Sequence, residues 1–256
     1  MNPCNQMTSG KLEIKIYKNR REMGAGAARH GVERARQVIA EKGKVNIIFA
    51  AAPSQFELYE SLLASDLDFG KVNAFHMDEY LGLPADAPQG FGNLLKTHLF
   101  SKRTFGSVHY INGQTHDPEE ECRRYEELLL QFPPDIIFHG IGENGHLAFN
   151  DPPSADFSDQ RTVKTVAMDE ICRNQQVHDG CFSEISQVPE RAITLTIPIL
   201  TGRDTYLVVT VPGPSKVLAV RRTVKEEIST ACPATILRQH PHAAMFLDLE
   251  AAAEIV

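Results

Sequence analysis

The sequence predicts an α/β protein with three layers, an open, mostly parallel sheet with helices on both faces. Short apolar runs of strand length alternate with longer helical patterns along almost the whole chain, which is typical of this architecture. Some of these runs end at polar, loop-forming segments. Ligands of open α/β sheets bind at such strand ends. No repeat, low-complexity stretch or linker divides the 256 residues. We therefore expect one domain over residues 11–256, after a disordered tail at residues 1–10.

Each strand is expected at an apolar or β-branched run bounded by turn residues. The expected strands are Leu12–Tyr17, Val45–Ala50, Val72–Met77, Val108–Ile111, Asp135–His139, Thr162–Val166, Ala192–Ile197, Thr205–Val211 and Ala243–Leu247. The expected helices are Arg21–Lys42, Ser54–Ala64, Phe91–Phe100, Pro118–Gln131, Ser215–Thr223 and Ala234–Gln239. Asp117 should cap the fourth helix, because proline follows it at the first helical position. The aperiodic stretch Pro152–Gln160 is a candidate lid or site loop.

The composition of the chain argues against several classes of function. A net charge of −7 with scattered basic residues argues against a nucleic-acid partner. No apolar run approaches the ~18–20 residues of a membrane span, and the first ten residues lack the apolar stretch of a signal peptide. Five cysteines at irregular spacings, without a C-x-x-C pair, indicate free thiols in a reducing cytoplasm. The ten histidines show no metal-ligand spacing, so we expect no metal.

A glycine-rich loop follows the expected strand Asp135–His139. It reads Gly140-Ile-Gly-Glu-Asn-Gly-His-Leu-Ala-Phe-Asn-Asp151, with three glycines in six residues. Such a backbone can fold tightly and come close to a ligand. His146 lies inside the loop, and a carboxylate follows five residues later. Imidazole moves protons near neutral pH, and a nearby carboxylate can fix its tautomer and raise its basicity.

A second expected strand, Val72–Met77, ends in Asp78 and Glu79. Ligands of parallel sheets bind outside the carboxyl ends of the strands, so Asp78 and His146 are expected in one shared site. The alternative for each residue alone is structural. One of the two acidic residues would then cap the next helix, and His146 would stabilise its own turn.

Two strand–turn–helix segments could hold a phosphate. Pro212–Lys216 opens a helix with a hydroxyl and a lysine, and Ala52-Pro-Ser54-Gln55 has the same pattern. A helix N-terminus offers free N–H groups and a positive dipole end. Arg173 could pair with a phosphate bidentately. An ordinary helix cap with a solvated lysine, and a surface arginine, are the alternatives.

Two motifs, Phe75-His-Met-Asp-Glu-Tyr-Leu-Gly-Leu-Pro84 and Gly140-Ile-Gly-Glu-Asn-Gly-His-Leu-Ala-Phe-Asn-Asp-Pro152, resemble the glucosamine-6-phosphate deaminase (isomerase) family. The resemblance runs over nearly the whole chain and includes Glu121–Glu126, Gln187–Pro189 and Leu237–Pro241. The sister 6-phosphogluconolactonases share the fold and a related Gly-His loop. They usually lack the Met-Asp-Glu-Tyr and Ala-Phe-Asn elements. The resemblance implies a Rossmann-like fold of the deaminase/lactonase type.

The resemblance also implies a metal-free reaction without an organic cofactor. An amino-sugar 6-phosphate, first of all glucosamine 6-phosphate, would be converted to fructose 6-phosphate and ammonia. Asp78 would be the base for the C2 proton, and His146 with Asp151 and Asn144 would open the sugar ring. Ser54 and Lys216 match positions that hold the phosphate. The further residues expected around the substrate are Gln55, Glu79, Gly142, Gly145 and Arg173.

Several positions depart from the family pattern. Asn144 stands where aspartate is commonest, and Asp151 where glutamate is usual. Ser54 ends an Ala-Pro-Ser turn in place of Gly-Gly-Thr, and Asp179 occupies the place of an arginine. These changes keep three alternatives open, namely a galactosamine-6-phosphate deaminase, a 6-phosphogluconolactonase-like hydrolase and a catalytically weak sugar-phosphate sensor. The sequence also leaves homo-oligomerisation open.

Overall fold

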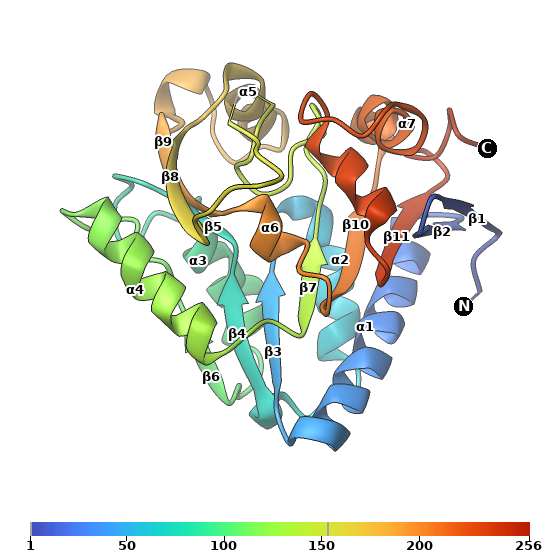
Figure 1. Cartoon of the computed structure of the whole chain (residues 1–256), viewed down its shortest axis with the longest axis horizontal. Coiled ribbons are helices and arrows are strands. Elements are labelled where there is room, and N and C mark those ends of the chain that lie inside the picture. Colours follow the sequence, from blue (N-terminus) through green and yellow to red (C-terminus); the bar gives the residue numbers. More distant parts are fainter. Residues whose placement is uncertain (1, 153) are drawn as a thin grey trace.

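An eight-stranded sheet runs through the centre of the molecule, which we describe from a computed structural model for residues 2–152 and 154–256 (Figure 1). Every neighbouring pair is parallel except β1–β2 at one edge. In order across the sheet, the strands are β1 (Asn5–Ser9), β2 (Leu12–Tyr17), β11 (Ala243–Asp248), β10 (Tyr206–Val211), β7 (Ile136–His139), β3 (Val45–Phe49), β4 (Val72–His76) and β6 (Ser107–His109).

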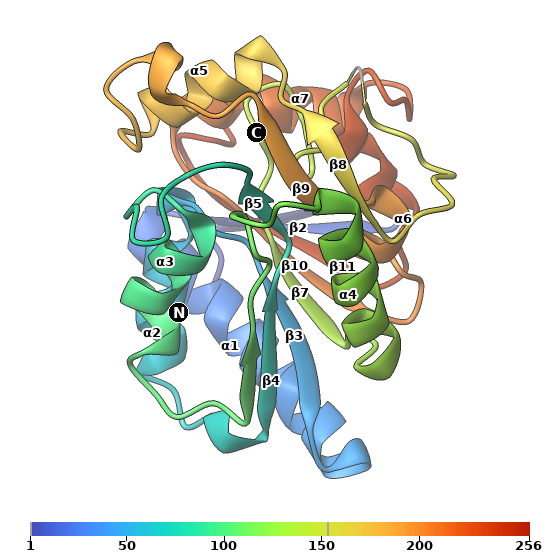
Figure 2. The same cartoon turned by 90° about the vertical axis from the view of Figure 1, so that its left-hand side faces the viewer.

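Helices cover both faces of this sheet (Figure 2), which confirms the predicted fold class. The first face carries α1 (Arg20–Lys42), α2 (Phe56–Leu63) and α3 (Phe91–Leu95), the last continued by a π-helical turn at Lys96–Phe100. The second face carries α4 (Pro118–Gln131), α6 (Ile197–Leu200) and α7 (Val217–Lys225). Short 3-10 turns lie at Pro53–Gln55, Phe69–Lys71, Ile185–Gln187, Pro214–Lys216 and Pro233–Gln239. Asp117 caps α4 as predicted, because its Oδ1 accepts from the backbone N–H groups of residues 119 and 120 at 3.0 Å.

The strand sequences explain why the sheet is buried on both sides. Successive side chains of a strand point to opposite faces. In β7, Ile136 and Phe138 therefore join the core beneath α1 and α2, while Ile137 joins the core beneath α4 and α7. In β3, Phe49 joins the first of these two cores and Ile48 joins the second. Continuous apolar runs of this kind are typical of parallel strands covered by helices on both faces.

A smaller antiparallel sheet lies above the carboxyl ends of the main strands (Figure 1). Its order is β5 (Asp78–Tyr80), β9 (Arg191–Leu195) and β8 (Val163–Ala167). The two strands expected near residues 162–166 and 192–197 are thus present, but they pair here and not in the main sheet. Only Met77 separates β4 from β5, so the chain crosses directly from one sheet to the other at Asp78.

Three sequence predictions need correction. Asn5–Ser9 is not a disordered tail, because it pairs with β2 through a turn in which Gly10 has a φ of +58°. The segment Glu170–His178 forms a helix, α5, that was not predicted because its buried side chains are mostly polar. Residues 234–239 adopt a 3-10 helix in place of the expected α-helix.

The described part of the chain contains no helix that is both long and apolar enough to cross a membrane.

Candidate active site

A pocket opens where the connections of the main sheet change direction. From β3 the chain moves outward to β4 and β6, whereas from β7 it moves the other way to β10 and β11. Ligands of open α/β sheets bind at such a switch point, outside the carboxyl ends of the strands. The pocket is lined by Ala50, Ala51, Ala52 and Ser54 after β3, Met77 and Asp78 after β4, Gly140, Ile141, Gly142, His146, Ala148 and Phe149 after β7, Lys216 after β10, Phe91 of α3, and Gln175, Gln176 and Asp179 around α5.

Asp78 is a buried carboxylate on the pocket wall. It is the first residue of β5, and its side chain makes no hydrogen bond with any described residue. Burial, followed by the negative charge of Glu79, raises the pKa of Asp78 well above its ordinary value. A carboxylate that water and hydrogen-bond donors do not stabilise is a stronger base, so this position suits proton abstraction.

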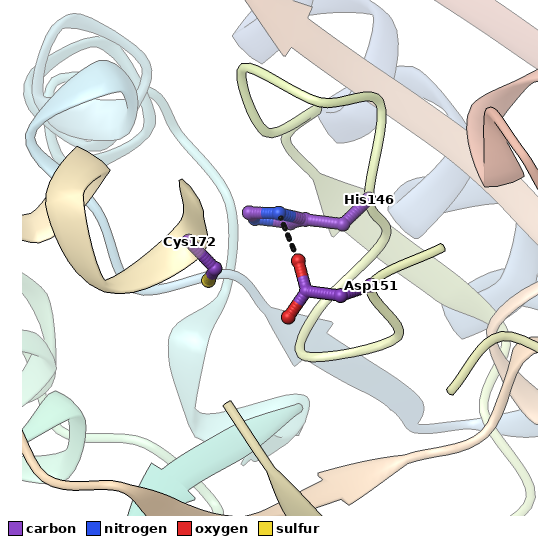
Figure 3. A group of neighbouring side chains, drawn as sticks. All are labelled: His146, Asp151 and Cys172. Atoms are coloured by element: carbon purple, nitrogen blue, oxygen red, sulfur yellow. Dashed lines mark ion pairs between the residues drawn. The ribbon is translucent and has the colours of Figure 1, made fainter. Parts of the chain in front are cut away.

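His146 and Asp151 come together as the loop motif predicted. The imidazole Nδ1 lies 2.9 Å from Oδ1 of Asp151 (Figure 3). The distance is that of an ion pair, but the carboxylate lies out of the direction required for a hydrogen bond. Burial acts to raise the pKa of Asp151. The neighbouring imidazole and the amide of Asn144 outweigh burial and hold this pKa below its usual value, so the carboxylate stays ionised.

Asn144 acts on Asp151 and not on the imidazole ring. Its Nδ2 donates to Oδ1 of Asp151 at 2.9 Å and to Oδ2 of Asp169 at 3.5 Å, while its Oδ1 accepts from the backbone N–H of His146 at 3.0 Å. The asparagine therefore positions the carboxylate and closes the turn that carries the histidine. Cys172 of α5 lies beside Asp151 but does not line the pocket, and burial, followed by the negative charge of Asp151, raises the pKa of its thiol well above the ordinary value.

The glycines of the loop are required by the packing of His146. A Cβ on Gly142 would lie only 2.1–2.3 Å from three atoms of the imidazole ring. Gly145 has a φ of +89°, which a side chain would disfavour, and a Cβ there would meet Sγ of Cys232 at 2.5 Å. Asn150 fixes the far end of the loop, because its Nδ2 donates to the carbonyl groups of Leu147 and Leu195 at 2.8 Å.

A buried cation lies in the same pocket. Lys216 is 5% exposed, and its ammonium group makes no hydrogen bond with any described residue. Burial lowers its pKa, although the carboxylates of Asp179 and Glu143 act in the opposite direction. Gln55 does not line the pocket. It links Ser54 to β10 through Nε2, which donates to the Ser54 hydroxyl at 3.2 Å and to the Thr210 carbonyl at 3.3 Å.

Besides Gln55, three of the expected substrate contacts do not line the pocket. Both carboxylate oxygens of Glu79 accept from backbone N–H groups, including those of Phe91 at 3.0 Å and Gly92 at 2.8 Å. Glu79 thus caps α3, which was the structural alternative. The guanidinium of Arg173 donates to the carbonyl groups of Ile185 and Val188 at 3.0 and 2.8 Å and does not line the pocket. Gly145 also lies outside the lining.

Sequence reasoning missed the residues that α5 brings to the pocket. Gln175 and Gln176 line it together with Asp179, the residue after the helix. The Oε1 atoms of the two glutamines accept at 2.8 Å from the backbone N–H of Glu143 and from the hydroxyl of Tyr80. Their i, i+1 and i+4 spacing would have indicated one polar helical face, had a helix been predicted there. Residue 153 of the expected lid lies outside the described residues, and no residue of 152 or 154–160 lines the pocket.

The geometry defines a class of protein: an α/β fold with a buried carboxylate, an imidazole and a buried lysine in one pocket, and a second carboxylate behind the imidazole. Comparison with known proteins assigns the family. The model of glucosamine-6-phosphate isomerases/6-phosphogluconolactonase matches residues 18–246. A glucosamine-6-phosphate deaminase of Lactobacillus delbrueckii subsp. bulgaricus is 31% identical over 245 residues, which is 94% of this chain and 98% of the relative. One of Listeria welshimeri is 34% identical over 226 residues, or 87% and 94% of the two chains. The chain therefore belongs to the glucosamine-6-phosphate isomerase/6-phosphogluconolactonase family.

Solved structures agree with this assignment. A monomeric glucosamine-6-phosphate deaminase superposes with a TM-score of 0.85 at 27% identity and covers 94% of this chain and 98% of its own. A 6-phosphogluconolactonase from Thermotoga maritima has a TM-score of 0.75 at 19% identity, with 93% and 100% covered. The second likeness shows the shared fold alone.

The Gly142→Ala substitution tests whether the loop glycine is needed to seat the imidazole. The added methyl group overlaps the ring, so either the ring or the loop must move. We expect the free energy of unfolding to fall by about 1–3 kcal/mol in denaturant titrations. Gly202→Ala is the matched control, since its Cβ would meet Thr205 at an ordinary 3.5 Å. Equal stability of the two variants would contradict this account of the loop.

Proposed function

We propose that the protein catalyses the isomerising deamination of an amino-hexose 6-phosphate, with glucosamine 6-phosphate and water giving fructose 6-phosphate and ammonia. One observation carries the proposal. Asp78, His146 and Lys216, which follow three different strands of the main sheet, line a single pocket. The deaminase names of relatives at 31–34% identity support the same activity.

Each group has a defined task in this reaction. The ammonium of Lys216 and the hydroxyl of Ser54 hold the phosphate, and a buried cation without another partner suits a dianion. The imidazole of His146 moves the proton between the ring oxygen O5 and the C1 hydroxyl, which opens the sugar. Asp151 stabilises the ring of His146 when it is protonated. Asn144 keeps Asp151 in place through its amide.

Asp78 then isomerises the open chain. Its carboxylate takes the proton from C2 and returns one to C1, through an enol-type intermediate that carries the nitrogen. Water adds to the resulting C2 imine, and the C–N bond breaks to release ammonia. The raised pKa of Asp78, which is caused by burial, makes its carboxylate a strong enough base to take a carbon-bound proton and a competent acid to return it.

The lactonase alternative uses less of this site. Hydrolysis of a lactone needs an activated water but no proton abstraction at carbon, so it leaves Asp78 without a task. The lactonase of Thermotoga maritima is also only 19% identical, whereas the relatives above 30% are named as deaminases. A galactosamine 6-phosphate substrate differs only at C4 and is tested in parallel. Five unpaired cysteines favour a reducing compartment, and we extend the proposal to a cytoplasmic enzyme.

Ammonia release tests the activity and the base together. We expect the wild-type protein to release ammonia from glucosamine 6-phosphate with EDTA present, and Asp78→Asn to lower kcat by about 10²–10⁴-fold. Asp86→Asn is the control, because Asp86 is an exposed aspartate that lies outside the pocket. Normal turnover in Asp78→Asn would disprove the assignment of the base. If the wild type binds both amino-sugar phosphates but releases ammonia from neither, the result would favour the sugar-phosphate sensor.

Asp78→Asn should also stabilise the protein in a pH-dependent manner. The folded state raises the pKa of Asp78, so it holds a proton that the unfolded chain releases near its ordinary pKa of about 3.9. Ionising this buried group therefore destabilises wild type as the pH rises above that value, whereas the neutral amide escapes the penalty. We expect the variant to melt at a higher temperature than wild type at pH 7–8, and the difference to shrink towards pH 4. A difference in melting temperature that stays constant from pH 4 to pH 8 would contradict the description of Asp78 as a buried carboxylate without a partner.

Lys216→Met should separate binding from chemistry. Removing the cation takes away a charge-assisted hydrogen bond to the phosphate, worth about 1.5–3 kcal/mol. We expect a KM about 10–100-fold higher with kcat changed much less, from initial rates over a range of sugar phosphate. A kcat that collapses at unchanged KM would place Lys216 in the chemical step and not at the phosphate.

A further inference from the structure

We propose that His146, Asp151 and Cys172 form a Zn²⁺ site, and that Zn²⁺ bound there reversibly inhibits the enzyme. The three side chains come from distant parts of the sequence, two from the loop after β7 and one from α5. Figure 3 shows Asp151 and Cys172 on the same side of the imidazole ring of His146. All three residues are buried.

The distances fit a metal ligand set. One potential ligand atom of each residue lies within 4.8 Å of the other two, and the imidazole Nδ1 is 2.9 Å from Oδ1 of Asp151. In a tetrahedral zinc site, nitrogen, oxygen and sulfur ligands lie about 2.0–2.3 Å from the ion. Metal binding therefore requires the imidazole of His146 to turn so that Nδ1 faces the ion, together with small shifts of the other two side chains. The helix that carries Cys172 is attached to the loop by the hydrogen bond between Glu143 and Gln175, so both elements are held together.

Two of the three side chains carry buried polar atoms without partners. Among the described residues, Oδ2 of Asp151 has no hydrogen-bond partner, and Nδ1 of His146 has only the ion-pair contact with Oδ1 of Asp151, which lacks hydrogen-bond geometry. Leaving a buried polar atom unsatisfied costs about 1–3 kcal/mol, and more when the group is charged. A single cation between them would satisfy both atoms and would also meet the negative charge of the carboxylate. These orphaned atoms point to a ligand that belongs in this position.

The chemistry of the donors favours zinc over Mg²⁺ and Ca²⁺. Imidazole, carboxylate and thiolate together suit Zn²⁺, whereas Mg²⁺ and Ca²⁺ prefer oxygen ligands alone. The side chain of Asn144 already orients the carboxylate, as outer-sphere partners do in zinc sites. Three protein ligands leave a fourth position open for water. On binding, the thiol of Cys172 loses its proton to solvent and the zinc–sulfur bond forms.

Inhibition follows from the nitrogen that the ion would occupy, and this step rests on the function proposed above. Zinc on Nδ1 leaves the imidazole neutral, with its remaining proton on Nε2. The ring can then neither accept a proton from the substrate nor become the cation that Asp151 stabilises. Ring opening would stop while the phosphate position around Lys216 stays free.

Cobalt gives a test of the site that is independent of activity. The full-length, EDTA-treated protein is titrated with Co²⁺, whose thiolate complexes show charge-transfer absorption in the near ultraviolet. We expect this band in wild type and its loss in Cys172→Ala, which removes the sulfur ligand and leaves a small, folded core change. Cys181→Ala is the matched control, because Cys181 is another free thiol near α5 but is not part of the cluster. Absence of the band in wild type, or its persistence in Cys172→Ala, overturns the site.

Zinc inhibition of ammonia release is measured on the same proteins. We expect Zn²⁺ to inhibit wild type and Cys181→Ala alike, and EDTA to restore activity. Cys172→Ala should keep near wild-type basal turnover and need at least about 10-fold more Zn²⁺ for half-inhibition. Equal sensitivity of Cys172→Ala shows that zinc acts elsewhere and refutes the proposal. If the protein proves not to be a deaminase, the cobalt spectrum still decides the site, so the two failures are distinguishable.

Discussion

The parallel alignment of β10, β7, β3 and β4 is the constraint on which the site depends. Because these strands run in the same direction, the loops that follow them leave the sheet at one edge. The reversal of strand order between β7 and β3 then separates their outgoing connections and opens a pocket between them. Lys216, His146 and Asp78 meet there although the sequence places them up to 138 residues apart. No local contact between these residues brings them together.

The conformation of the loop after β7 depends on its backbone as much as on its side chains. Ala148 adopts a φ of +50°, which is unfavourable for a residue with a Cβ. The side chain of Asn150 donates to the loop on one side and to β9 on the other, and these bonds hold the loop next to Ala148. The imidazole of His146 packs directly on Gly142. These contacts place the imidazole at the pocket in the absence of a substrate.

The sequence predicts the elements that bury apolar side chains, and fails where a helix buries polar side chains or where a strand such as β1 buries few side chains at all. The main strands follow from their hydrophobic runs, and the loop around His146 follows from its glycines. The helix α5 could not be found in this way, because it buries Gln175 and Gln176 towards the pocket. Asp78 was expected at a strand end, but its membership of a second sheet depends on pairing with β9, which is more than 100 residues away. The roles of Glu79 and Arg173 likewise depend on which backbone groups the fold brings near them.

The pocket holds two ionisable side chains in an environment that disfavours their charged forms. Asp78 and Lys216 are buried without hydrogen-bond partners among the described residues, and burial moves the pKa of each towards its neutral form. Water would stabilise both charges better than this environment does. In the reaction proposed above, a phosphate would supply the counter-charge that the lysine lacks, and transfer of the substrate proton would neutralise the carboxylate. Binding energy would then come from groups that the empty protein holds in an unfavourable state, so stability and function oppose each other at these two residues.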